Sequence, residues 1–209
     1  QFGAALVFFN KFLSTRANLS GIRWIDKALI DEICKFCSVM NNDSSFCFEK
    51  FRNFRTEVSC IRPEADSNGV WPAISATLRS ADALVVISPE WHGMASPALK
   101  NLFMYAGRAE LAHKPALLVG VSGGQGGSYP LAELRASSYK NCRICYLPEH
   151  LIVRNVERVM NPGEPTSEDD LRIRARADWA MDLLLDYAEA LAPLHARHRN
   201  PPTEWMNGM

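Results

Sequence analysis

The chain has 209 residues, of which 47% are hydrophobic, so it is long enough to bury a sizeable core. Its 23 basic and 23 acidic residues balance, so no overall field recruits nucleic acid or a membrane surface. No run of about 18 apolar residues occurs, and residues 2–9 are too short and lack a cleavage site for a signal peptide. We therefore expect a cytoplasmic protein with no nucleic-acid and no membrane partner.

Six cysteines occur, and four of them form the C-x-x-C pairs Cys34/Cys37 and Cys142/Cys145. Such pairs can bind zinc. Zinc knuckles usually lie in tight glycine-rich or polar turns, whereas these pairs have apolar neighbours such as Ile144. This favours buried free thiols in a reducing compartment and predicts no metal site.

The first predicted strand covers residues 6–12, and apolar residues at helical spacing predict a helix over residues 22–37. The loop between them carries Ser14, Thr15, Arg16, Asn18 and Ser20. A hydroxyl-rich loop before a helix can bind phosphate, because free N–H groups and the positive end of the helix dipole point at it. The alternative is that these residues only cap the helix.

Residues 40–64 alternate phenylalanines loosely with charged residues, which is typical of an edge strand followed by a loop. Residues 72–80 predict a short helix. The unbroken apolar run at residues 83–87 predicts a strand that is covered on both faces, as in a parallel sheet. A helix is predicted from residue 98 to residue 103.

The loop between that strand and helix contains Pro89, Glu90, Trp91, His92 and Gly93. In parallel sheets the ligand binds at the carboxyl ends of the strands. Pro89 stiffens the exit from the strand, Gly93 permits close approach or a positive φ, and Trp91 offers a flat face. We therefore expect a planar ligand at this loop. The alternative is an ordinary loop in which Trp91 caps the core.

The next predicted strand, residues 116–121, ends in a glycine-rich turn. The turn begins with Ser122, Gly123, Gly124 and Gln125 and continues with two more glycines. Four glycines between a strand and a helix indicate positive φ angles or close approach by a ligand. The spacing fits neither a Walker loop nor the dinucleotide-binding pattern. A flexible turn without a ligand is the alternative.

The rest of the chain predicts a helix at residues 129–140, a last strand at 149–156 and a long helix at 171–194. An acidic first turn indicates that the long helix starts at residue 166 or 167. We divide the chain into one domain, residues 1–196, and an irregular tail, residues 197–209. The tail is expected either to be disordered or to dock on a partner subunit.

Three of these segments resemble the NAD(P)H-dependent FMN reductase family, flavodoxin-like proteins that include azo- and quinone reductases. SPEWHGMASPALKN at residues 88–101 is similar to the family's SPEYHG…P…LKN segment, whose loop lies against the isoalloxazine ring of FMN. STRANLSG at residues 14–21 resembles the phosphate loop GS-x-R-x-x-S, with Leu13 in place of the family's glycine. The glycine turn, followed by Leu134 and Arg135, resembles the third flavin loop.

The resemblance covers roughly residues 12–156 and implies an α/β fold, a flavodoxin-like three-layer sandwich. Its five-stranded parallel sheet has the order 2-1-3-4-5. It also implies that FMN and NAD(P)H are the cofactors and that the residues named above in the three loops bind FMN. A hydride would pass from the nicotinamide through FMN to a small-molecule acceptor, such as a quinone, an azo compound or free flavin. No catalytic side chain is needed, and His92 is read as a structural residue rather than a proton donor.

Relatives of this type commonly form homodimers or homotetramers. Leu102, Phe103, Met104 and Tyr105 are candidates for such an interface, unless they belong to the core. The alternative function is a flavodoxin-type electron carrier, although carriers are usually strongly acidic and this chain is neutral. A third reading is a domain that binds no flavin because the Leu13 side chain crowds the phosphate.

Overall fold

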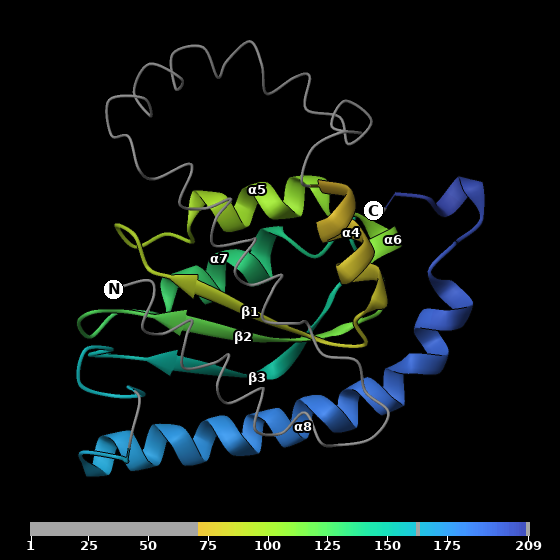
Figure 1. The fold of residues 1–209 in the computed structure, drawn as a ribbon. Helices are drawn as coiled ribbons and strands as arrows, with labels where there is room; N and C mark the ends of the chain where they lie inside the picture. The colour runs from red at the N-terminus through yellow and green to blue at the C-terminus, as the bar shows by residue number, and fades with distance from the viewer. Residues whose placement is uncertain (1–70, 162–163, 208–209) are drawn as a thin grey trace, which may run out of the picture.

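The computed structural model describes residues 71–161 and 164–207 (Figure 1). The helices and strands, in chain order, are α4 (Trp71–Ser80), β1 (Leu84–Pro89), α5 (Pro97–Tyr105), α6 (Arg108–Leu111), β2 (Pro115–Val121), α7 (Tyr129–Ser137), β3 (Cys145–Val153), α8 (Glu168–His198) and the 3-10 helix η3 (Thr203–Trp205). Strand and helix therefore alternate through the described part of the chain, which is the pattern of a parallel α/β sheet.

The described sheet is parallel and has the order β1-β2-β3. All residues of the central strand β2 are buried, whereas β1 alternates between buried and half-buried positions. The apolar run at residues 116–121 therefore marks a strand that is covered on both faces. The run at residues 83–87, for which this coverage was predicted, is covered only in part, because alternate residues of β1 are half-buried. The first two strands of the predicted order 2-1-3-4-5 fall outside the described residues, so that order stays a prediction.

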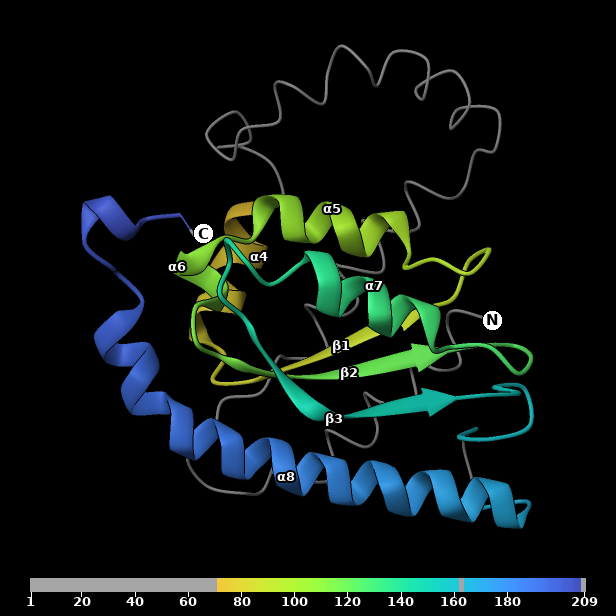
Figure 2. The ribbon, with the colours of Figure 1, turned by 180° about the vertical axis from the view of Figure 1, so that it is seen from behind.

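Successive residues of β2 supply two separate cores. Leu117 and Val119 pack with Met181 and Leu184 of α8 on one face of the sheet. Leu118 belongs to the core of the other face, with residues of α4, α6 and α7. Figures 1 and 2 show the same arrangement from opposite sides, with α8 below the sheet and α4, α5 and α7 above it. The described residues thus form three layers.

The last strand is longer at its start and shorter at its end than predicted. β3 covers Cys145–Val153 instead of residues 149–156, and it includes Pro148. The register between β2 and β3 shifts there, because Ala116 pairs with Tyr146 but Leu118 pairs with His150. Proline cannot donate to a ladder and is tolerated at such irregularities. Because Pro148 is atypical of a strand interior, the sequence pattern did not predict the first half of β3.

Helix ends follow local capping chemistry. Ser96 caps α5 by accepting a hydrogen bond from Leu99 N at 3.4 Å, so the helix begins at Pro97. Ser167 caps α8 in the same way through Asp170 N at 3.2 Å, and acidic residues fill the first turn as predicted. α8 continues past the predicted residue 194 to His198, although Pro193 lies inside it.

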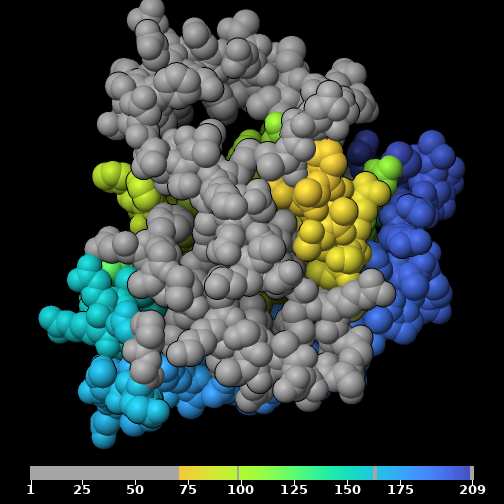
Figure 3. All heavy atoms as spheres, in the orientation of Figure 1, coloured from red at the N-terminus to blue at the C-terminus, as the bar shows by residue number. Residues whose placement is uncertain are grey.

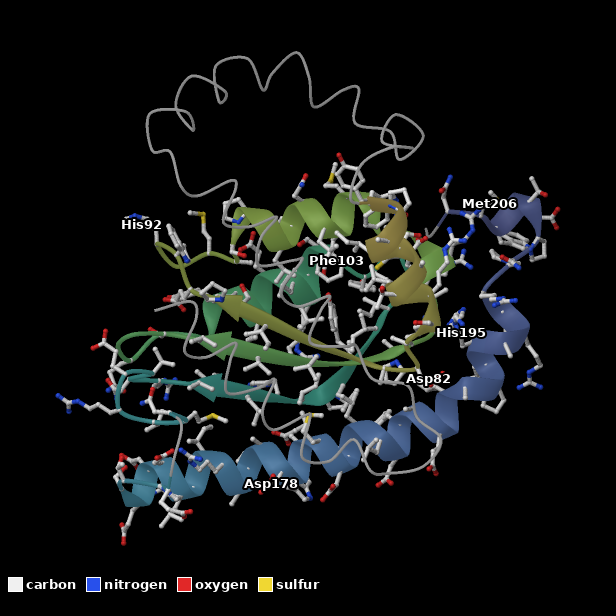
Figure 4. All side chains as sticks on the ribbon, viewed as in Figure 1. Asp82, His92, Phe103, Asp178, His195 and Met206 are labelled. Carbon is white, nitrogen blue, oxygen red and sulfur yellow. The ribbon has the colours of Figure 1, made fainter. Side chains whose placement is uncertain are left out.

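The interface candidates on α5 divide between the core and the surface. Leu102 and Phe103 pack against the core of the upper face, and Figure 4 shows the Phe103 side chain on the sheet side of the helix. The Tyr105 ring lies 5.2 Å from the Trp71 ring. Met104, in contrast, is 73% exposed. Only Met104 therefore presents most of its side chain to the surroundings.

The segment after α8 contacts its own chain at the amino ends of the strands. Arg108 of α6 donates to the Met206 carbonyl at 3.4 Å, and Arg143 donates to the Trp205 carbonyl. His195, near the end of α8, lies with Nδ1 2.7 Å from the Ala112 carbonyl (Figure 4). Figure 3 shows that α4 and the end of α8 both reach the surface on the face seen there. These contacts lie at the edge of the sheet opposite to the loop after β1.

Among the described helices, none is both long enough and apolar enough to cross a membrane.

Candidate functional site

The loops after β1, β2 and β3 meet at one edge of the sheet, because parallel strands end at the same edge (Figure 1). Backbone hydrogen bonds continue the strand pairing into these loops. Glu90 N donates to the Val121 carbonyl at 2.8 Å, and Ser122 N donates to the Val153 carbonyl at 2.9 Å. The loop after β1, residues 90–96, which we call the aromatic loop, is therefore a neighbour in space of the glycine turn, residues 122–127, although the two are separated in sequence.

The loop after β1 is a two-residue hairpin. Trp91 and Met94 exchange both backbone hydrogen bonds, at 3.0 and 2.9 Å. The two residues between them have positive φ, +48° at His92 and +76° at Gly93, as tight hairpin turns of this type require. The turn leaves Trp91 46% exposed and Met94 51% exposed. Trp91 is therefore about half-exposed and does not cap the core as a buried side chain would.

His92 lies at the outer end of this hairpin. Its side chain is exposed, and Figure 4 shows it pointing away from the sheet. The turn requires a positive φ at residue 92. Histidine suits this position, because polar residues adopt positive φ more easily than bulky or branched ones.

The glycine turn contains two kinds of glycine. Gly127, and Gly120 at the end of β2, are required by the protein itself: a Cβ at Gly120 would lie 2.0 Å from the Gly127 carbonyl oxygen, and a Cβ at Gly127 would lie 2.7 Å from Ile152 Cγ2. A Cβ at Gly126 would lie 2.5 Å from Glu90 Oε1, at the end of a side chain that would have to shift. Gly127 also has a φ of +100°. Gly123 and Gly124, however, have no positive φ, and a Cβ there would meet no atom of the described residues within 4 Å. Their bare backbone is open to approach by a ligand.

The loop after β3 holds the carbonyls of the glycine turn. The Ser122 carbonyl accepts from Val156 N at 3.2 Å, and the Gly124 carbonyl accepts from Asn155 N at 3.0 Å. Arg154 Nε donates to the Gly126 carbonyl at 3.1 Å. In a trans peptide the next N–H points opposite to the carbonyl. The N–H groups of the residues that follow each of these carbonyls therefore point away from the loop after β3.

These N–H groups differ in what they contact. Gly127 N donates to Glu90 Oε2 at 2.5 Å, and Gly124 N donates to Ser122 Oγ at 3.2 Å. Within residues 71–161 and 164–207, no acceptor is bonded to the N–H groups of Gly123 and Gln125. The turn thus offers two backbone donors on the side away from the loop after β3, where they can bond carbonyl oxygens or a developing negative charge on a planar ligand.

A second carboxylate contacts the aromatic loop from the opposite direction. Glu133 of α7 accepts a hydrogen bond from Ala95 N at 2.7 Å and forms an ion pair with Lys100 of α5. The hydrogen bond from Lys100, and then the bond from Ala95, hold the pKa of Glu133 below its usual range. Glu133 is therefore ionised at neutral pH and remains an acceptor.

A polar hollow opens on the other side of the glycine turn, between the loop after β3 and the start of α8. Its lining includes Gln125, whose side chain lies 3.5 Å from Asn155 Oδ1. Exposed arginines such as Arg158 and acidic residues such as Glu157 alternate around it. Because neither sign of charge dominates, the hollow does not select anions or cations.

The structure thus brings together the predicted site residues of two loops, which are Pro89, Glu90, Trp91, His92, Gly93, Ser122, Gly123, Gly124 and Gln125. The predicted phosphate-loop residues Ser14, Thr15, Arg16, Asn18 and Ser20 lie outside the described residues. Sequence reasoning missed Glu133, Arg154 and Asn155, which support the loops. Only Asn155 carried a signal, because asparagine just after a strand is well suited to a positive φ, here +47°.

The described C-x-x-C pair consists of free thiols. Cys142 is buried and lies with Sγ 2.9 Å from the Ser138 carbonyl, and burial raises the pKa of both Cys142 and Cys145. In the described ranges, no group of three or more histidine, cysteine or acidic side chains is arranged to hold a metal ion. Cys34 and Cys37 lie outside the described residues.

The sequence model described as "NADPH-dependent FMN reductase" matches residues 23–157. The chain belongs to this family. The resemblance predicted from the loop motifs is therefore confirmed, and the fold is a flavodoxin-like α/β fold. The matched range includes the two loops described above and begins after the predicted phosphate loop, residues 14–20.

Known relatives match only parts of their own length. An NADPH azoreductase from Bacillus sp. (strain OY1-2) is 38% identical over 65 residues, which cover 31% of this chain and 36% of the relative. An oxidoreductase from Corynebacterium diphtheriae is 16% identical with a TM-score of 0.42, covering 61% of this chain and 62% of the other. The apo form of an NADH:FMN oxidoreductase is 16% identical with a TM-score of 0.45, covering 66% and 70%.

Proposed function

We propose that this chain is an NAD(P)H-dependent, FMN-containing oxidoreductase. The observation that carries the proposal is the open backbone of Gly123 and Gly124 at the same sheet edge as the half-exposed Trp91, in a chain of the FMN reductase family. When bound, FMN supplies the hydride chemistry, accepting a hydride from the nicotinamide and passing it to a second acceptor.

The residues fit such a ligand in size and chemistry. Gly123 and Gln125 offer N–H donors to the carbonyl oxygens of a flavin ring, and these donors favour the extra negative charge of its reduced form. Trp91 offers a flat apolar surface for an aromatic ring. Hydride transfer requires positioning and electrostatics rather than a side-chain acid or base, so no catalytic side chain is assigned.

The other parts of the proposal rest on the sequence. Residues 1–196 form the FMN-binding domain, and Ser14, Thr15, Arg16, Asn18 and Ser20 hold the FMN phosphate. The acceptor is a quinone, an azo compound or free flavin, and the azoreductase relative favours the azo compound. The protein acts as a homodimer or homotetramer, with exposed Met104 at the contact.

Substitution of Gly123 by alanine tests the site directly. Among the residues that the structure describes, none has an atom within 4 Å of a Cβ at Gly123, so the Gly123→Ala variant should fold with the thermal stability of the wild type. A bound flavin would meet that Cβ, and the dissociation constant of FMN should rise about tenfold or more, the equivalent of one lost hydrogen bond. FMN titration followed by fluorescence measures this constant.

The Gly107→Ala variant is the matched control. Its Cβ also meets only an ordinary contact, Glu110 Oε2 at 3.7 Å, and Gly107 lies between α5 and α6, away from the strand-end loops. It should bind FMN as the wild type does. A folded Gly123→Ala variant with unchanged FMN affinity would contradict the site assignment.

A further inference from the structure

Two carboxylates connect the aromatic loop and the glycine turn in opposite directions. Glu90, in the loop after β1, accepts from Gly127 N of the glycine turn at 2.5 Å. Glu133, in the helix that follows the glycine turn, accepts from Ala95 N of the aromatic loop at 2.7 Å. The aromatic loop thus binds the backbone of the glycine turn, and α7 binds the backbone of the aromatic loop. Both are charge-assisted hydrogen bonds, the stronger kind of hydrogen bond in proteins.

The glycine turn is shaped around Glu90. A Cβ at Gly126 would lie 2.5 Å from Glu90 Oε1, so the carboxylate lies directly against the bare backbone of that residue. At the same peptide, Arg154 holds the Gly126 carbonyl from the other side. The peptide between Gly126 and Gly127 is therefore fixed at both its oxygen and its nitrogen.

The aromatic loop is fixed in a similar way. Glu133 holds Ala95 N, and the buried Ser88 hydroxyl accepts from Ser96 N at 3.4 Å. Both bonds lie just after the hairpin that carries Trp91. The ion pair with Lys100 further ties Glu133 to α5. The hairpin therefore projects from a base whose backbone is held in place.

Resting on the proposed function, we infer that Glu90 and Glu133 are positioning residues of the flavin site. They fix the Trp91 face relative to the open N–H groups of Gly123 and Gln125, without themselves contacting the ligand. Loops that are already ordered lose little conformational entropy when the ligand binds, so this preorganisation increases the affinity for the ligand. Glu90, which the family resemblance implied as a cofactor contact, instead acts through the Gly127 backbone.

Glu90→Ala and Glu90→Gln variants test this role. The alanine variant loses the bond to Gly127 and should raise the dissociation constant of FMN about tenfold. The glutamine variant keeps an uncharged acceptor and should raise it only about threefold. Glu133→Ala and Glu133→Gln should follow the same order, because the bond to Ala95 is of the same kind. This graded recovery by an isosteric acceptor is not expected of a residue that only fills space.

The Glu149→Ala variant is the matched control. Glu149 is also a carboxylate in an ion pair, with Arg176 of α8, but it lies on β3 away from both loops. Its FMN affinity should equal that of the wild type. Circular dichroism verifies that each variant is folded, and where an alanine variant does not fold, its glutamine counterpart carries the test.

The outcomes separate the two proposals. Wild-type protein that binds no FMN overturns the proposed function, and the inference with it. Wild-type protein that binds FMN, together with folded Glu90 and Glu133 variants of unchanged affinity, overturns the positioning role alone. The positioning role is also overturned if FMN affinity falls equally in the alanine and glutamine variants of Glu90 and Glu133 and in Glu149→Ala. Such a result would reflect a general loss of stability.

Discussion

Lys114 is a charged residue in the interior, with only 1% of its surface exposed. Its ammonium donates to the carbonyls of Leu78 and Arg79 at 2.7 and 3.0 Å. These carbonyls belong to the last turn of α4, where a helix has no internal donors left. The Lys114 side chain, which comes just before β2, therefore caps the carboxyl end of α4. This cap lies at the edge of the sheet opposite to the site. Burial lowers its pKa to about 8.

This pKa predicts an unusual dependence of stability on pH. Between pH 8 and 10.5 the unfolded chain keeps the proton on Lys114 while the folded chain loses it. The unfolded state binds more protons in this window, so the free energy of unfolding rises with pH. Between pH 7.5 and 9.5 the wild type should gain about 1–2 kcal/mol relative to Lys114→Met. Urea unfolding at both pH values measures the difference, and an unchanged difference would contradict the pKa assignment.

At the scale of elements, the glycine turn between β2 and α7 combines two requirements. One part of it is fixed by crowding and positive φ, and the other part is open. Sequence reasoning found the turn from its glycines but could not separate the two kinds, because the separation depends on Ile152 of β3 and Glu90 of the loop after β1. Both are distant in sequence and close only in the folded sheet.

The same substitution should therefore change the free energy of unfolding at one position of this turn and not at another. At Gly127, with a φ of +100°, an added Cβ would lie 2.7 Å from Ile152 Cγ2. Gly127→Ala should lower the free energy of unfolding by about 2 kcal/mol or more, through backbone strain and overpacking. Gly123→Ala should leave it unchanged. Thermal unfolding of both variants measures this contrast, and equal melting temperatures would show that the turn is not divided in this way.

The bounds of the elements were predicted well where local chemistry decides them. The apolar run of β2 and the acidic first turn at the start of α8 act within a few residues, so they are visible in the sequence. The start of β3 was wrong because a register shift accommodates Pro148. The short helix α6 was missed because a four-residue helix leaves too little periodicity to detect.

At the scale of the whole molecule, the sequence predicted the parallel arrangement and the two loops that meet at its edge. Motif resemblance located Trp91 and Gly123, because their neighbours in sequence carry the pattern. It did not reveal the bond between Glu133 and Ala95, which lie 38 residues apart, or the carbonyl contacts from the loop after β3. Those contacts exist only once the sheet has formed, so no local pattern encodes them.

The central claim is that this edge of the sheet holds a flavin that accepts a hydride from a nicotinamide. The most direct measurement is the visible absorbance spectrum of the FMN-loaded protein during anaerobic addition of NADPH or NADH. We predict that the flavin band bleaches rapidly with one of these nicotinamides and without dithionite. A protein that binds FMN but bleaches only with dithionite would contradict the reductase and indicate an electron carrier, and a protein that binds no FMN would contradict the site itself.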